Sequence, residues 1–199
     1  MTTVHTLASG SSGNAAVLSC GNTHLLIDAG ISCRRITAAL KELGLTPADL
    51  TAILITHTHS DHISGLNTLL KKTACPLLAT PRTCRELSCR VEGIDPRLMG
   101  LDSPITLGEI DMQPIPTSHD APGSCGWRFD TDGGSVGFLT DTGYISSTFT
   151  DTSCFSTAFT ETGCFSTAFT ETSCFSTAFT ESGCKEDYKE CLYKGESEK

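Results

Sequence analysis

The sequence predicts an α/β fold built from stacked layers of helices and strands. Thr23 to Asp28 has the pattern of a strand, Ser32 to Leu43 that of an amphipathic helix, and the apolar run Ala52 to Ile55 that of a buried strand. This order of strand, helix and strand is typical of α/β layers. Strand patterns return from Ile105 onward. A chain of 199 residues is long enough for one domain with a sizeable core.

The first strands form a hairpin before that helix. Val4 to Leu7 is predicted to be a short strand, followed by a loop of small residues. Ala15 to Ser19 and Thr23 to Asp28 are predicted to pair across a turn at Gly21. Asp28 therefore ends a strand, where its carboxylate could cap the helix that follows.

The predicted helix has one apolar stripe. Its apolar residues recur at the i, i+3, i+4, i+7 spacing of an amphipathic helix, at Ile36, Ala39, Leu40 and Leu43. Gly44 follows directly and predicts the end of the helix.

The stretch HTHSDH, residues 57–62, holds four side chains that can bind a metal. On a continued strand His57, His59 and Asp61 would share one face, with His62 on the other. A tight loop at the end of the buried strand can instead make all four converge. Imidazole and carboxylate ligands suit Zn²⁺, and also Mn²⁺ or Fe. The alternative is a polar loop of solvated histidines, but three histidines and an aspartate this close together favour a metal centre.

Further elements are expected between the histidine stretch and residue 140. They are a short helix at Gly65 to Lys72, a strand at Pro76 to Ala79, a helix from Thr80 to about Cys89, paired strands from Ile105 to Ile115, and a hairpin of Trp127 to Phe129 with Val136 to Thr140. His119 falls in a loop beside Asp120. Asp141 ends the last strand, as His57 ends its own.

The net charge of −9 is concentrated in the C-terminal part. Residues 1–140 hold thirteen acids and ten bases, whereas residues 141–199 hold ten acids and four bases. Nucleic-acid binding usually needs a basic patch that neutralises phosphates. The one candidate cluster consists of Lys71, Lys72, Arg82, Arg85, Arg90 and Arg97. It is either a solvated face or a contact surface for a phosphodiester.

The composition also predicts a compartment. No apolar stretch approaches the length that spans a bilayer, and the first residues lack the pattern of a signal peptide. We therefore expect a cytoplasmic protein with no membrane contact. Its eleven cysteines include no CxxC pair, so we expect reduced thiols and no zinc ribbon.

Four motifs resemble the metallo-β-lactamase-fold hydrolases, whose first metal motif is HxHxDH. They are ASGSSGN at Ala8 to Asn14, LLIDAG at Leu25 to Gly30, ITHTHSDHISG at Ile55 to Gly65, and PTSHDAPGSCGWRF at Pro116 to Phe129. More narrowly, they are similar to the YycJ-type (WalJ-like) branch of that family. The resemblance covers residues 1 to about 146 and implies an αββα sandwich, of which only the N-terminal half is matched.

The resemblance also implies a two-metal site. One metal is assigned to His57, His59 and His119, and a second to Asp61, His62 and Asp141, with Asp141 bridging. Two divalent ions, Zn²⁺ with Mn²⁺ or Fe as alternatives, would hold a hydroxide that attacks a carbonyl or phosphoryl centre. Asp61 would act as the catalytic residue that carries a proton to the leaving group. Asp28 would orient the site by hydrogen bonds. His119 alone could be an ordinary loop histidine, but its place in PTSHD favours a ligand.

The chain departs from the family after Asp141. Four ten-residue copies begin at residues 141, 151, 161 and 171, and only the first follows a predicted strand, so Asp141 is preferred to Asp151 as a ligand. We expect a truncated domain at residues 1–146, the repeats at 147–184 and a charged tail at 185–199. The repeats could stack as short strands or form a weakly ordered tail.

The departure has two expected consequences. The family has a further metal-binding histidine near its C-terminus, whereas this chain has no histidine after His119, so the second metal site should be incomplete. One of the cysteines at 154, 164, 174, 184 or 191 could substitute. The first sheet should also expose the face that a second half would cover, which would favour a homo-oligomer through that face.

These features predict a metal-dependent hydrolase that uses a metal-bound hydroxide. Its substrate would be a small molecule or a nucleic-acid phosphodiester, which makes a phosphodiesterase or nuclease the first hypothesis. A thioester or lactone hydrolase is compatible with the same site. The alternative from another class is a truncated, catalytically impaired family member with at most a binding role.

Overall fold

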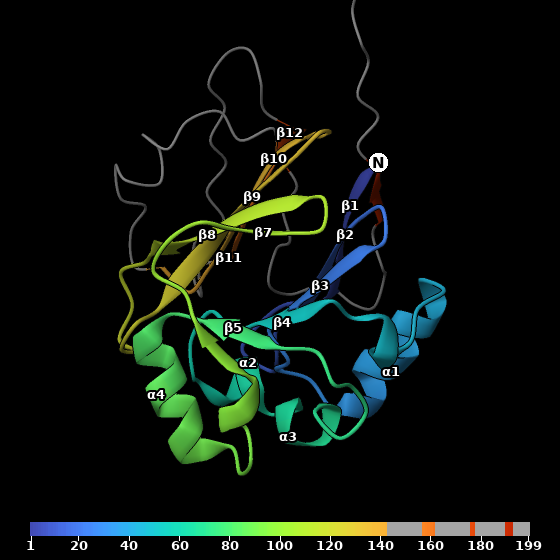
Figure 1. The fold of residues 1–199 in the computed structure, drawn as a ribbon. Coiled ribbons are helices and arrows are strands. Elements are labelled where there is room, and N and C mark those ends of the chain that lie inside the picture. Colours follow the sequence, from blue (N-terminus) through green and yellow to red (C-terminus); the bar gives the residue numbers. More distant parts are fainter. Residues whose placement is uncertain (143–156, 162–175, 178–189, 193–199) are drawn as a thin grey trace, which may run out of the picture.

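The computed structural model describes residues 1–142, 157–161, 176–177 and 190–192. Two β-sheets pack face to face, and the helices lie against the outer face of the first sheet (Figure 1). Three layers of an αββα sandwich are therefore present in the described part of the chain. Most of the repeat tail lies outside the described residues.

The first sheet contains the N-terminal strands and the predicted buried strand. Its order among the described strands is β13-β1-β2-β3-β4-β5-β6. The strands are β1 (Thr2–Ala8), β2 (Ala15–Cys20), β3 (Thr23–Ile27), β4 (Ala52–Leu54), β5 (Leu77–Ala79), β6 (Leu98–Gly100) and β13 (Glu190–Leu192). β3, β4, β5 and β6 run parallel, so their carboxyl ends meet at one edge.

The second sheet is formed by the strands between residues 105 and 140 and by two segments of the repeats. Its order among the described strands is β12-β11-β10-β9-β8-β7. The strands are β7 (Ile105–Leu107), β8 (Ile110–Pro116), β9 (Cys125–Thr131), β10 (Gly134–Thr140), β11 (Thr157–Glu161) and β12 (Ser176–Thr177). β11 lies parallel to β10, with Val136 opposite Thr157. The second and fourth repeat copies thus extend this sheet.

Four α-helices and two 3₁₀ turns connect the described strands. They are α1 (Cys33–Glu42), α2 (Ser60–Ile63), α3 (Leu66–Leu69), α4 (Pro81–Arg90), and the turns at Pro47–Asp49 and Asp95–Arg97. α1 begins at Ser32, whose hydroxyl accepts a hydrogen bond from the Arg35 backbone N–H at 3.4 Å. Ser32 rather than Asp28 therefore caps α1. The predicted helix at Gly65 to Lys72 is shorter than expected, and α4 begins at the expected N-cap, Thr80.

The space between the two sheets is a closed apolar core. Residues of the first sheet meet residues of the second there, among them Leu18, Leu25, Ile27, Leu54, Met112, Trp127 and Phe129. All seven of these side chains are at most 1 % exposed. The expectation that the first sheet exposes an apolar face is therefore wrong for the described residues, because β8, β9 and β10 cover that face.

Candidate metal centre

Three predicted ligands and the predicted orienting residue, Asp28, come from four strand ends at one edge of the sandwich. Asp28 follows β3, and His57 follows β4 after two intervening residues. These two strands are parallel, so both side chains emerge at the same edge. In the second sheet Asp141 directly follows β10, and His119 lies in the loop between β8 and β9. The packing of the two sheets therefore brings the four strand ends together.

The histidine stretch was expected to be a tight loop, but it contains a single helical turn, α2. His59 is extended, with φ −64° and ψ 152°, and the helical residues of α2 begin at Ser60. The turn carries His62 back beneath His57, so that their ring centroids lie 4.0 Å apart. His62 is completely buried. This turn explains how side chains that alternate along a strand can converge.

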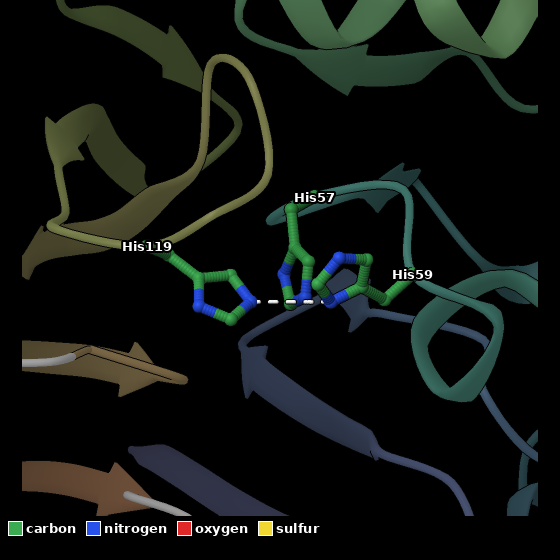
Figure 2. Close-up of side chains that lie close together, drawn as sticks. All are labelled: His57, His59 and His119. Carbon is green, nitrogen blue, oxygen red and sulfur yellow. Dashed lines mark hydrogen bonds between the residues drawn. The ribbon is translucent and has the colours of Figure 1, made fainter.

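His57, His59 and His119 form a first potential ligand group (Figure 2). One ligand atom from each of the three lies within 4.8 Å of the other two. His119 Nε2 lies 3.2 Å from His59 Nδ1, which is the contact drawn in Figure 2. Asp120 stands outside them, with Oδ1 at 3.5 Å from His59 Nε2 and 3.3 Å from His119 Nε2. Three imidazoles that face one another are the donor set of a catalytic zinc site.

His57, His62 and Asp141 form a second group with the same spacing. Asp141 Oδ2 lies 2.7 Å from His62 Nε2 and 3.9 Å from His57 Nε2. Asp141 thus lies beside His62 and near His57, the residue that both groups share. Asp61 is near this group but outside it, with Oδ2 3.6 Å from His62 Nε2. The structure therefore brings all six predicted ligands to one place.

Asp28 is the buried centre of a hydrogen-bond network behind the ligands. Its Oδ1 accepts from the Thr56 backbone N–H at 2.9 Å, and its Oδ2 accepts from the Thr56 hydroxyl at 2.8 Å and from His62 Nδ1 at 2.7 Å. Because Asp28 accepts the Nδ1 proton, Nε2 of His62 is the nitrogen directed at Asp141. Asp28 adopts φ 60° to make these contacts. The network supports the expected orienting role of Asp28.

Asn14 and Gly30 hold the other side of α2. The Asn14 side-chain amide lies 2.9 Å from His62 Nε2 and donates to Asp61 Oδ2 at 3.4 Å. The Asn14 backbone N–H donates to the Asp61 carbonyl at 2.7 Å. A Cβ on Gly30 would lie 1.5 Å from that same carbonyl oxygen, so only glycine fits there. No role was predicted from the sequence for Asn14 or Thr56, although both lie inside the motifs that carry the family resemblance.

The two central histidines are held in different protonation states. Burial, and then the charge of His62, lower the pKa of His57 to about 3. Burial also lowers the pKa of His62, but Asp28 and Asp141 outweigh it and raise that pKa to about 10. Burial raises the pKa of Asp141, while the hydrogen bond and charge of His62 more than reverse this and lower it. Without metal, His57 is neutral and His62 carries a proton that a metal would displace.

The position of the proton on the His57 ring suits a metal ligand. The Thr56 hydroxyl donates its one proton to Asp28, so it can only accept at its 3.0 Å contact with His57 Nδ1. The proton of neutral His57 therefore lies on Nδ1, and Nε2 has a free lone pair. That Nε2 is buried and has no hydrogen-bond partner among the described residues. A buried acceptor of this kind is costly unless something binds it, and a metal shared with the neighbouring groups would do so.

Two packed sheets with a histidine and aspartate centre at the strand ends define the class of metallo-β-lactamase-fold proteins. The chain belongs to the beta-lactamase superfamily domain family, which matches residues 23–174. This match extends beyond the predicted boundary at residue 146 and includes repeat residues. The three proposed segment boundaries remain predictions.

Curated relatives confirm the resemblance to the YycJ-type branch. The chain is 41 % identical over 145 residues to exodeoxyribonuclease WalJ of Streptococcus pneumoniae, covering 70 % of this chain and 54 % of that protein. It is 34 % identical over 143 residues to exodeoxyribonuclease YycJ of Bacillus anthracis, with the same two coverages. The chain thus spans about half the length of the curated relatives it matches.

Solved structures show the same fold at lower identity. A diphosphatase of the PhnP family superposes with a TM-score of 0.62 at 22 % identity, covering 79 % of this chain and 72 % of that one. The Rm3 metallo-beta-lactamase superposes with a TM-score of 0.59 at 21 % identity, covering 73 % of this chain and 65 % of that one. These likenesses establish the arrangement of sheets and helices.

Two other predictions can be compared with the described residues. None of the described helices is long and apolar enough to cross a membrane. The cysteines at 154, 164, 174 and 184, named as substitute ligands, lie outside the described residues. Cys191 lies in β13, opposite Val4 of β1.

Proposed function

We propose that this chain is a metal-dependent phosphodiesterase that acts on nucleic acid. The observation that carries the proposal is the pair of ligand groups that share His57, because two adjacent metal sites suit displacement at a phosphoryl centre. Relatives named exodeoxyribonucleases support a nucleic-acid substrate. We propose Zn²⁺ as the metal, with Mn²⁺ or Fe as the alternatives.

The proposed ligands are His57, His59 and His119 for one ion, and Asp61, His62 and Asp141 for the other. Bound metals would lower the pKa of a coordinated water and stabilise negative charge on the substrate oxygens. The Asp61 side chain is 26 % exposed, and it approaches His62 and Asn14 through the same oxygen, Oδ2. This partial exposure supports a role for Asp61 in moving a proton between the centre and solvent.

The experiment combines metal analysis with two substrate classes. Purified protein is loaded with Zn²⁺ or Mn²⁺, its metal content is measured, and cleavage of DNA is compared with hydrolysis of a thioester and lactone panel. We expect metal-dependent DNA cleavage, and we expect His59→Ala to lose both the first metal and the cleavage. Thioester or lactone hydrolysis without DNA cleavage would contradict the proposed substrate and support a thioester or lactone hydrolase. His24→Ala is the matched control, since His24 contacts Ser19 and lies outside both ligand groups.

One observation favours the alternative of a catalytically impaired protein. The sequence holds no histidine after His119, so the second group draws on His57, His62, Asp141 and the adjacent Asp61. One metal per chain, bound without hydrolysis of any tested substrate, would support a binding role instead.

A further inference from the structure

Helix α4 contacts the loop that carries His119. The hydroxyls of Thr80 and Thr83, at the N-cap and in the first turn of α4, lie 2.7 and 3.0 Å from the carbonyl oxygen of Gly123. A Cβ on Gly123 would lie 2.8 Å from Thr80 Oγ1 and 2.8 Å from Arg82 Cβ. Gly123 also has φ +80°, so the loop depends on glycine to pack this closely.

The last turns of the same helix contact the loop that carries His57 and His59. Thr58 is the residue between the two histidines and is 2 % exposed. Its hydroxyl donates to Glu86 Oε2 at 2.5 Å, and its carbonyl oxygen accepts from Arg90 Nη1 at 2.8 Å. α4 therefore holds both the side chain and the backbone of Thr58.

The two loops come from different sheets, and they also meet directly through the contacts of His59 with His119 and Asp120. His59 and His119 are 60 residues apart in sequence. Apart from α4, the Cys125 backbone N–H donates to the Thr56 carbonyl at 3.1 Å. Imidazole nitrogens must lie about 2.0–2.1 Å from a zinc ion, so small movements of one loop against the other displace a ligand. A helix that contacts both loops can set their spacing.

We propose that α4 is a positioning brace for the first ligand group, which holds the His119 loop through Thr80 and Thr83 and the His57 and His59 loop through Glu86 and Arg90. This inference rests on the proposed metal centre, and none of the four brace residues is itself a ligand. Thr83 is completely buried, so its hydroxyl has no access to solvent as an alternative partner. Loss of its contact would leave the Gly123 carbonyl held by Thr80 alone and let the His119 loop shift.

The test uses matched substitutions at each end of the brace. Thr83→Val and Thr58→Val keep the side-chain shape and remove the hydroxyl, whereas Thr83→Ser and Thr58→Ser keep the hydroxyl. Zn²⁺ affinity is measured on the full chain by competition with a chromophoric chelator. We expect each valine variant to bind about 10–100-fold more weakly, the range found when hydrogen bonds behind metal ligands are removed. Each serine variant should bind as the wild type does.

Two further readouts separate positioning from general stability. The melting temperature of the metal-free valine variants should stay close to that of the matching serine variants. The Co²⁺ absorption spectrum of Thr83→Val should change, because it reports the ligand geometry. Arg85→Gln is the control on the same helix, since Arg85 is exposed and forms no ion pair with any described residue. It should leave Zn²⁺ affinity unchanged.

The outcomes distinguish this inference from the proposed function. If wild-type protein binds Zn²⁺ and the valine variants bind it equally tightly, the brace is wrong and the proposed function stands. If the wild type binds Zn²⁺, hydrolyses nothing, and the valine variants bind weakly, the brace stands and the proposed function fails. If the wild type binds no metal through these histidines, both are overturned.

Discussion

Replacing Asp28 by asparagine tests whether the network behind the ligands controls the metal centre. The carboxylate accepts three hydrogen bonds at zero exposure, two from Thr56 and one from His62 Nδ1. An amide supplies one acceptor atom and one NH₂ group, so at least one of these donors would face another donor. The least costly arrangement turns the NH₂ toward His62, whose Nδ1 must then lose its proton and accept a hydrogen bond from the amide.

The magnitude follows from the contacts that are lost. An unsatisfied buried donor costs about 1–3 kcal/mol, and a hydrogen bond to a charged group contributes about 1.5–3 kcal/mol, so we expect a loss of about 2–4 kcal/mol in the free energy of unfolding. At about 2–4 °C per kcal/mol for a chain of this size, the melting temperature should fall by roughly 10 °C. The affinity of the second metal should also fall, because His62 binds a metal through Nε2 only with its proton on Nδ1, where the asparagine NH₂ would oppose that proton.

The assay is thermal unfolding of chelator-treated protein, followed by a metal titration of the folded variant. Asp102→Asn is the matched control, because Asp102 is exposed and should tolerate the same chemical change. A melting temperature of Asp28→Asn within about 1 °C of wild type, together with unchanged affinity for both metals, would refute the network as the organiser of the site.

Three more predictions rest on the same structure. The two carboxylates beside His62 raise its pKa from 6.5 to about 10. In metal-free protein they therefore stabilise the folded state fully below pH 6.5, and this stabilisation is lost as the pH rises through 10. The urea concentration at the midpoint of unfolding should fall over that interval, and a rise would contradict the prediction. Gly30→Ala should reduce the free energy of unfolding by at least about 3 kcal/mol, measured in urea, because its Cβ meets the Asp61 carbonyl. Burial raises the pKa of the Cys125 thiol, whereas Cys89 is exposed; a thiol reagent should label Cys89 in the native protein and Cys125 only after denaturation, as peptide mapping would show.

Local patterns were enough to predict much of the fold. The apolar stripe of α1, the threonine and proline that begin α4, and the strand pattern of β8 each depend on residues within one turn or one strand. Such signals can be read from a short segment, because backbone geometry and side-chain period create them. The single turn α2 was not predicted, since four residues are too few to show a helical period.

The sequence by itself determined which residue types could form the centre, because HTHSDH places four donors within one short segment. Only the tertiary structure decided how they combine. His57 belongs to both ligand groups, and Asp28 supports His62 across 34 residues rather than capping α1. It also decided that the second sheet covers the apolar face of the first. The physical reason is that these contacts join strand ends far apart in the chain, and the packing of two sheets, which no local period encodes, sets their distances.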